Sequence, residues 1–372
     1  MRIAINTRFL LPNKLEGLGW YTHELVRRMV LRHPEHEFIF LFDRPFDPAF
    51  VYAPNVRPIV LFPPARHPLL WYAWFEWAIP GALRRLGADV FFSPDGFLSL
   101  RAQTRSLMTV HDLIPLQYPE QVPWQPRAYY RFFIPRYIRR ADCLLAISEH
   151  VKQSALEVLQ VDPSKITVVY NGCRDGFFPL PEPDRQEVQR RFSGGADYFF
   201  YTGAIHPRKN IPRLIRAFDA FKKRTGARVK LLLAGRFAWH TGPVQGAYEA
   251  AWNKEDIIFL GYVSEADLQG LMASALALVY VSLSEGFGLP VLEAFHSDVP
   301  VICSDTSALP EVAGGAALLV NPLSEHEISR GLEKIYTDPA LRTTLTGLGR
   351  RQRLKFNWDT AAAQIFDLLI KF

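Results

Sequence analysis

Short apolar runs alternate with amphipathic stretches along nearly the whole chain, and this alternation constrains the fold more than any other feature. In the first half the runs are Arg2–Asn6, Glu37–Phe42, Ala88–Ser93, Ser106–His111, Asp142–Ser148 and Ile166–Tyr170. They are rich in Val, Ile, Leu and Phe and do not alternate with polar residues, which is typical of strands buried on both faces of a parallel sheet. Helical patterns such as Gly19–Leu31 lie between them. The sequence therefore predicts an α/β fold built from βα units on parallel sheets.

The alternation is interrupted once, at residues 171–185, where N-G, D-G and P-L-P-E-P give the chemistry of turns and linkers. The apolar runs then resume as Tyr198–Gly203, Val229–Ala234, Asp256–Phe259, Ala277–Val281 and Val301–Cys303. We therefore predict two Rossmann-like, doubly wound domains, residues 1–178 and 179–356, with a final helix in 357–372 packing back on the first. If the carboxyl ends of the two sheets face each other, ligands bind in a central cleft between the domains.

Composition excludes several classes of protein. With 49% hydrophobic residues the chain is not a disordered protein, and 3 Cys in 372 residues do not make a disulfide scaffold or a Cys-rich zinc site. There is no apolar run of about 18 residues, and the N-terminus predicts a strand and not a signal peptide, so we expect a cytoplasmic protein. The net charge of +6 favours an anionic partner, which could be a phosphorylated ligand, a membrane surface or nucleic acid.

The strongest motif is S-E-G-F-G-L-P-V-L-E-A-F at Ser284–Phe295, directly after a predicted strand. Pro290 suits a first helical turn, and Gly286 and Gly288 let the backbone approach a ligand closely. The free N–H groups of such a helix start attract phosphate. Glu285 and Glu293 could each bind hydroxyls of one extended ligand. The alternative is a surface loop followed by a helix whose early Glu complements the helix dipole.

A second motif is Y-T-G-A-I-H-P-R-K-N at Tyr201–Asn210, which follows the first strand of the second domain. Asn210 is a candidate N-cap for the next helix. Arg208 and Lys209 lie beside that helix start, where cations oppose the helix dipole, so a bound anion explains them better. An R-K pair alone is a weak signal and is often structural.

Ser284–Phe295 resembles the E-x7-E motif of glycosyltransferase family four, retaining enzymes with the GT-B fold, residue by residue from Glu285 to Ala294. The resemblance implies that Glu285 touches the transferred sugar near the reacting carbon and that Glu293 binds the ribose hydroxyls of the nucleotide. It implies that Arg208 and Lys209 hold the donor diphosphate. In the R-x4-K form of the family's pair, however, the Arg would fall at Ala204.

The resemblance covers essentially the whole chain and is most specific over 200–325. It adds donor-binding positions in the glycine-containing loops and at the predicted base site, namely Gly17, Gly19, Gly203, Gly286, Phe287, Gly288, Leu289, Tyr262 and Val263. In G-x-G-W-Y-T, Thr22 replaces the third Gly of a dinucleotide fingerprint, which argues against a nicotinamide cofactor. At the end of the strand Ser106–His111, His111 corresponds to a histidine that the family has at this strand end. A lone H-D pair is otherwise often structural.

Together, the resemblance implies a retaining hexosyltransferase that uses a nucleotide diphospho-sugar, with Glu285, His111, Arg208 and Lys209 as catalytic residues. No D-x-D and no P-loop motif occurs in the sequence, so we expect neither a catalytic metal nor another cofactor. The G-x-G-W-Y-T start is similar to that of bacterial mannosyltransferases of surface polysaccharide and lipopolysaccharide synthesis. This favours GDP-mannose as donor, a saccharide or lipid-linked saccharide as acceptor, and no nucleic acid partner.

Two other functions remain open from the sequence. A non-hydrolysing UDP-sugar epimerase has the same fold, although the intact E-x7-E element argues against it. A non-catalytic nucleotide-sugar-binding protein would not need Glu285 and Lys209, and both are present.

Two segments combine aromatic and basic residues, Leu70–Pro80 and Arg127–Arg140. Interfacial helices mix aromatic anchors with Lys or Arg in this way, so the protein could lie peripherally on the inner face of a membrane. The alternative is that Trp71, Trp74 and Trp77 form an ordinary buried stripe.

Overall fold

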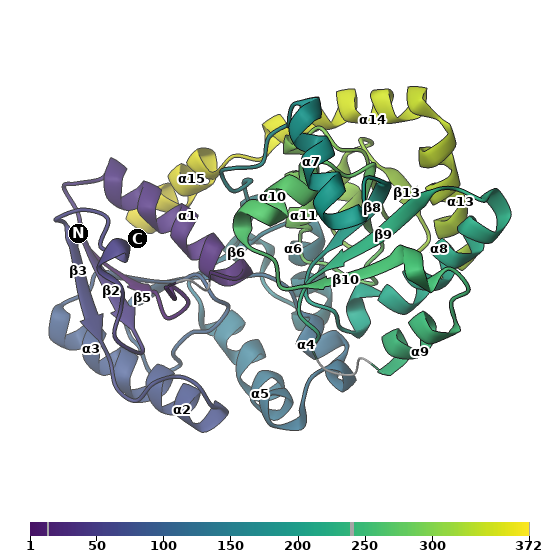
Figure 1. Cartoon of the computed structure of the whole chain (residues 1–372). Helices are drawn as coiled ribbons and strands as arrows, with labels where there is room; N and C mark the ends of the chain where they lie inside the picture. Colours follow the sequence, from purple (N-terminus) through teal and green to yellow (C-terminus); the bar gives the residue numbers. More distant parts are fainter. Residues whose placement is uncertain (13–14, 239–241, 372) are drawn as a thin grey trace. The chain divides into compact units, whose positions relative to one another are not determined.

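The computed structural model describes residues 1–12, 15–238 and 242–371. The chain divides into two compact units (Figure 1): unit 1 is Met1–Gly172 with Asn357–Phe372, and unit 2 is Cys173–Phe356. Phe372, which belongs to the predicted final helix, lies outside the described residues. Because the chain leaves unit 1 and returns to it, unit 1 is assembled from two segments far apart in the sequence.

Unit 1 is built on a seven-stranded, all-parallel sheet of order β3-β2-β1-β4-β5-β6-β7. Its strands are β1 Arg2–Asn6, β2 Glu37–Phe42, β3 Val56–Val60, β4 Val90–Ser93, β5 Arg105–Val110, β6 Cys143–Ala146 and β7 Ile166–Val168. Its helices are α1 Gly17–Arg32, α2 Pro68–Ala73, α3 Ile79–Leu86, α4 Ile114–Gln117, α5 Trp124–Arg140, α6 Glu149–Leu159 and α15 Trp358–Ile370. The strand order reverses between β1 and β4, which is the switch point where such sheets bind ligands.

Unit 2 repeats this architecture with a six-stranded parallel sheet of order β10-β9-β8-β11-β12-β13. Its strands are β8 Asp197–Thr202, β9 Val229–Ala234, β10 Ile257–Gly261, β11 Ala277–Tyr280, β12 Val301–Ser304 and β13 Leu318–Val320. Its helices are α7 Glu182–Ser193, α8 Ile211–Thr225, α9 Gly242–Ala250, α10 Glu265–Ala273, α11 Leu289–His296, α12 Leu309–Ala313, α13 Glu325–Thr337 and α14 Pro339–Gln352. The order reverses between β8 and β11, so these two neighbouring strands form the second switch point.

The two parallel sheets confirm the predicted α/β class, because the strands are buried as their composition requires. The inner strands β1, β8 and β11 are buried at nearly every position. Among the helices, α8 shows the expected pattern: Ile211, Leu214, Ile215, Phe218 and Phe221 are all buried, at spacings of three and four residues. The apolar stripe of α8 thus faces the core of unit 2.

Two strands and one helix differ from the sequence predictions. No apolar run in the sequence indicated β3 or β13. β3 is a partly exposed edge strand that contains Pro58, and β13 has only three residues. Helix α7 begins at Glu182, inside the segment 171–185 that we predicted to be a linker, with Pro181 at its N-cap. Proline is readily accommodated at a helix start, so the P-L-P-E-P sequence marks the beginning of a helix as well as a turn.

Helix α15 packs against α1, within unit 1 (Figure 1). Asp359 accepts hydrogen bonds from Arg28 Nε at 3.0 Å and from Arg32 Nη2 at 2.7 Å. The rings of His33 and Phe366 stack with centroids 3.4 Å apart. Across the described ranges, none of the helices is both long enough and apolar enough to cross a lipid bilayer.

Candidate active site

The two strongest sequence motifs meet at the switch point of unit 2. Tyr201–Asn210 leaves the carboxyl end of β8, and Ser284–Phe295 follows the carboxyl end of β11. Since β8 and β11 are hydrogen-bonded neighbours, both loops lie at the same edge of the sheet. The backbone joins them, because Leu283 N donates to Arg208 O at 2.8 Å.

Glu285 lies at the centre of this junction and binds both predicted cations. Lys209 Nζ donates to Glu285 Oε1 at 2.5 Å, and Arg208 Nη1 donates to Oε2 at 2.7 Å. Arg208 Nη1 also donates to the Ser284 carbonyl at 2.6 Å. Glu285 and Lys209 are both buried, so the ion pairs are shielded from bulk water. Glu285 is thus an anionic partner of the cation pair within the chain itself, in addition to the bound anion that the sequence predicts there.

The charges in this cluster set the protonation of its titratable groups. Burial alone would raise the pKa of Glu285, but Lys209 and Arg208 outweigh burial and lower that pKa to about 2. Burial, and then the charges of Arg208 and Lys209, lower the pKa of His206 to about 4. At neutral pH the cluster therefore contains an ionised Glu285 and a neutral His206.

An aromatic pair supports Lys209, and an amide fixes the loop that carries both cations. Lys209 Nζ also donates to the Tyr280 hydroxyl at 2.5 Å, and the rings of Tyr280 and Tyr201 stack with centroids 6.1 Å apart. Asn210 occupies the N-cap position of α8 as predicted, but within the described residues its side chain does not cap the helix. Its Nδ2 donates instead to the carbonyls of Val281 and Pro322, at 3.0 and 2.7 Å, which ties the loop to β11.

Two predicted glycines have backbone conformations that other residues rarely adopt. Gly203 has φ +137°, and its carbonyl oxygen lies so close to the neighbouring Gly235 that a Cβ on Gly235 would be 1.9 Å from it. Gly288 has φ +107° at the N-cap of α11, and a Cβ there would lie 2.6 Å from Leu309 Cδ2. Both loops depend on glycine for their backbone path, which brings main-chain atoms close together at the sheet edge.

Glu293, one turn inside α11, is buried and bound by an arginine that our sequence reasoning did not single out. Arg174 Nε and Nη2 both donate to Glu293 Oε1, at 3.0 and 2.7 Å. The third guanidinium nitrogen, Arg174 Nη1, donates to Glu265 Oε1 at 2.9 Å. Arg174 precedes the D-G turn in the segment that we interpreted as a linker, and for that reason we did not consider it as a site residue. Its only sequence signal was a cation next to the N-G element.

The remaining donor-binding predictions fall in two places. Gly286, Phe287 and Leu289 surround the start of α11; Phe287 is buried, with its ring 5.6 Å from that of Phe356. Tyr262 and Val263 follow β10, which is separated from β8 by β9. Tyr262 is 79% exposed, so its ring is available to a ligand.

Gly17, Gly19 and His111 belong to unit 1, and the structure does not place them relative to the unit 2 cluster. Gly17 and Gly19 lie in the first turn of α1, which begins two residues earlier than predicted. A Cβ on Gly19 would be 2.7 Å from the Phe9 carbonyl oxygen. His111 follows β5; its Nε2 is 2.6 Å from the Pro94 carbonyl oxygen and its ring packs edge-on against Tyr21. Burial lowers the pKa of His111, which favours the neutral imidazole.

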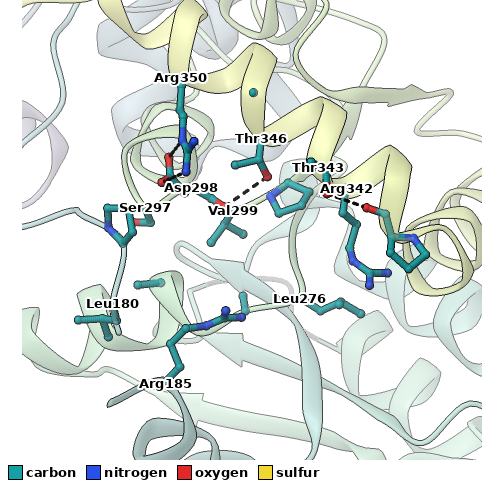
Figure 2. Close-up of a pocket in the computed structure, with 16 residues that line it drawn as sticks. Leu180, Arg185, Leu276, Ser297, Asp298, Val299, Arg342, Thr343, Thr346 and Arg350 are labelled. Carbon is teal, nitrogen blue, oxygen red and sulfur yellow. Dashed lines mark hydrogen bonds and ion pairs between the residues drawn. The ribbon is translucent and has the colours of Figure 1, made fainter. Parts of the chain in front are cut away.

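A cavity of ≈590 Å³ lies elsewhere in unit 2 (Figure 2). It is lined by Leu276 and Pro300, which come just before β11 and β12, so it opens at the amino ends of the strands. Its Arg350 is engaged by Asp298, with 2.8 Å between Nη2 and Oδ2. The carboxyl ends of the strands carry the Glu285 cluster, so this cavity is not part of the candidate active site. In the described part of the chain, no three His, Cys, Asp or Glu side chains gather as a metal site would require.

Each half of the chain matches a known protein family. Residues 15–175 match Glycosyltransferase Family 4, and residues 184–352 match Glycosyl transferases group 1. The chain is 29% identical over 372 residues to O-antigen chain mannosyltransferase B of Escherichia coli, covering 95% of each protein. It is 30% identical over 289 residues to O-antigen chain mannosyltransferase RfbU of Salmonella typhimurium, covering 77% of this chain and 76% of that protein.

Solved structures agree on the fold. The sucrose-phosphate synthase of Thermosynechococcus elongatus superposes with a TM-score of 0.79 at 20% identity, covering 100% of this chain and 98% of that one. Two parallel α/β sheets of this kind define the GT-B class of glycosyltransferases. The chain belongs to glycosyltransferase family four, as the residues around Glu285 suggested.

Proposed function

We propose that this glycosyltransferase moves mannose from GDP-mannose to a hydroxyl of a saccharide or lipid-linked saccharide, with retention of configuration, in cell-surface polysaccharide synthesis. The observation that carries the proposal is the cluster of Glu285, Lys209 and Arg208 beside the N-terminus of α11. The choice of mannose rests on the relatives, which are named O-antigen chain mannosyltransferases.

The donor diphosphate would be bound by the two cations together with the backbone N–H groups of Gly286–Leu289. Charge-assisted hydrogen bonds of this kind contribute about 1.5–3 kcal/mol each. They strengthen as the diphosphate leaves and its charge grows, and such charge stabilisation is usually the largest catalytic term. Glu293 would bind the ribose, and the backbone at Tyr262 and Val263 would contact the base.

Glu285 would orient the sugar and face its anomeric carbon. The low pKa of Glu285 keeps a negative charge there at neutral pH, where positive charge develops as the glycosidic centre gains oxocarbenium character. The bond from the anomeric carbon to the diphosphate oxygen breaks, and the acceptor oxygen forms its bond on the same face. The acceptor's proton passes to the departing diphosphate. We also propose His111, which follows β5, as a catalytic residue, and no metal ion takes part.

The surface of unit 1 suggests where the acceptor is found. In the two aromatic-basic segments Trp74 is buried, whereas Trp77 and Phe132 are 58% and 50% exposed and Trp124, at the start of α5, is 74% exposed. The predicted buried tryptophan stripe is therefore only partly correct. Helix α5 carries Trp124 and Phe132 together with Arg131 and Arg136, and the guanidinium of Arg136 lies over the Phe132 ring. Such a mixture suits the interface of an anionic membrane, so we propose a cytoplasmic enzyme in peripheral contact with the inner leaflet.

The test is a screen of GDP-mannose, GDP-glucose, UDP-glucose and ADP-glucose by thermal shift, followed by assay of nucleotide release with a mannose-terminated, lipid-linked acceptor. A ligand at 100 times its dissociation constant stabilises by about 2.7 kcal/mol, which such a screen detects. We expect GDP-mannose to stabilise most and GDP release to require the acceptor. Epimerisation of a UDP-sugar without acceptor would support the epimerase instead, and binding without turnover would support a sensor.

A further inference from the structure

The two oxygens of Glu293 are in different situations. Oε1 accepts two hydrogen bonds from one guanidinium, those of Arg174 Nε and Nη2. Oε2 accepts none from the residues that the structure describes. It is nevertheless not enclosed, because the fully buried polar atoms without a partner do not include it. A ligand hydroxyl can therefore reach Oε2, while the rest of the carboxylate is buried: the Glu293 side chain is only 4% exposed.

Arg174 is itself fixed from three sides. Glu293 and Glu265 bind its donors, and the Phe177 ring lies 5.1 Å from the guanidinium carbon. The side chain of Arg174 is 11% exposed, whereas that of Glu265 is 42% exposed, so the arginine spans from the buried carboxylate to the surface. The two carboxylates raise the pKa of Arg174 against the effect of burial. The guanidinium is thus permanently charged and held in one orientation.

We propose that Arg174 is a positioning residue that occupies Oε1 of Glu293 and turns Oε2 toward the ribose hydroxyls of the donor nucleotide. This inference rests on the proposed function, in which Glu293 binds the ribose.

The physical reason is the burial of the carboxylate. A buried carboxylate without a partner takes up a proton or becomes disordered, and either change weakens it as an acceptor. A planar guanidinium that donates twice to one oxygen holds that oxygen in place and leaves the second oxygen available to a ligand. Lysine would supply the charge but not the two-point contact, so it would restore the orientation of Glu293 only in part.

The experiment measures discrimination of the ribose, which a merely structural ion pair would not affect. Dissociation constants of GDP and 2′-deoxy-GDP are measured by calorimetry for the wild type, Arg174→Ala, Arg174→Lys, Glu293→Gln and the double variant. Arg216→Ala is the matched control, because it breaks an exposed Arg–Glu pair of 2.6 Å elsewhere in unit 2. Thermal midpoints are recorded for all variants.

We expect the wild type and Arg216→Ala to prefer GDP by about 10- to 100-fold, the range of a hydrogen bond to a charged group. Arg174→Ala and Glu293→Gln should each bring that ratio close to 1, with no further loss in the double variant. Arg174→Lys, which keeps the charge, should give an intermediate ratio.

The outcomes test the positioning role of Arg174 separately from the proposed ribose role of Glu293. If Glu293→Gln abolishes the preference for GDP and both Arg174 variants keep it, the positioning role is overturned and the proposed function stands. If the wild type shows no preference, or Glu293→Gln does not change it, the ribose role of Glu293 fails and both are overturned. Should Arg174→Ala not fold, a wild-type ratio in Arg174→Lys also overturns the inference.

Discussion

Two glutamates eight residues apart in one loop and helix have opposite surroundings. Both oxygens of Glu285 are bound by cations from the loop after β8, whereas Glu293 has one oxygen bound by Arg174 and one that no described residue binds. Full pairing makes Glu285 a fixed negative charge, suited to a site where charge develops. Partial pairing leaves Glu293 as an oriented acceptor, suited to binding a hydroxyl. In the proposed function, the same residue type thus serves two tasks because its partners differ.

The largest effect should come from removing the charge of Glu285. Glu285→Gln keeps the shape but removes the negative charge facing the anomeric carbon, so we expect kcat to fall by about 10³-fold with little change in the donor KM. Steady-state kinetics with the donor named by the screen would measure this. A raised KM with unchanged kcat would exchange the roles of the two glutamates.

The next largest loss of turnover should come from removing either cation. Lys209→Ala and Arg208→Ala should each lower turnover by roughly 10²–10³, the cost of removing one charge-stabilising donor. Lys209 is 8% exposed, so its loss should also lower the thermal midpoint, unlike the loss of a surface lysine. Either variant, if folded and retaining more than about half of wild-type turnover, would contradict the assignment.

The pH dependence of stability tests the pairing of Glu285 without any substrate. The pKa of Glu285 is lowered from 4.5 to about 2, so its ion pairs stabilise the fold fully above about pH 4.5 and lose that contribution as pH falls toward 2. The difference in unfolding free energy between the wild type and Glu285→Gln should therefore shrink by up to about 3 kcal/mol over that range. Urea titrations at pH 5, 4 and 3 would show it. A constant difference would mean that the pKa is not lowered.

A smaller effect is expected at Glu293. Glu293→Gln should raise the donor KM by about 10- to 100-fold and leave kcat within about threefold, because ribose is bound equally in the ground state and the transition state. The measurement is the same kinetic assay. If Glu285→Gln and Glu293→Gln changed kcat and KM in the same way, the two residues would not have different roles.

No effect is expected from chelators. In the proposed function Arg208 and Lys209 supply the positive charge at the diphosphate, so transfer should persist in excess EDTA. Loss of activity that magnesium or manganese restores would show that the cation pair is not sufficient.

The sequence predicted the parts of the fold that rest on local patterns. The inner strands and α8 were found because their apolar runs and helical spacing are strong, and the Glu285 loop was found because a family motif marks it. The strand β3 was missed because an exposed edge strand with a proline has no buried pattern.

The partners within the site could not be predicted in the same way. Arg174 lies 119 residues before Glu293, and no local pattern connects them. The burial of Lys209 depends on Tyr280, Tyr201 and Glu285, which come together only when β8 pairs next to β11. The sequence indicated the chemical groups, and the fold determined which of them pair.

The return of α15 to unit 1 has a consequence for how the protein is made. Residues 173–356 are synthesised after β7 and before α15. At ribosomal speeds of 5–20 residues per second this takes about 10–40 s. During that time α1 lacks the helix that covers it, so unit 2 can complete its fold before unit 1. The nascent chain would then complete unit 2, the proposed nucleotide-binding half, before it completes unit 1.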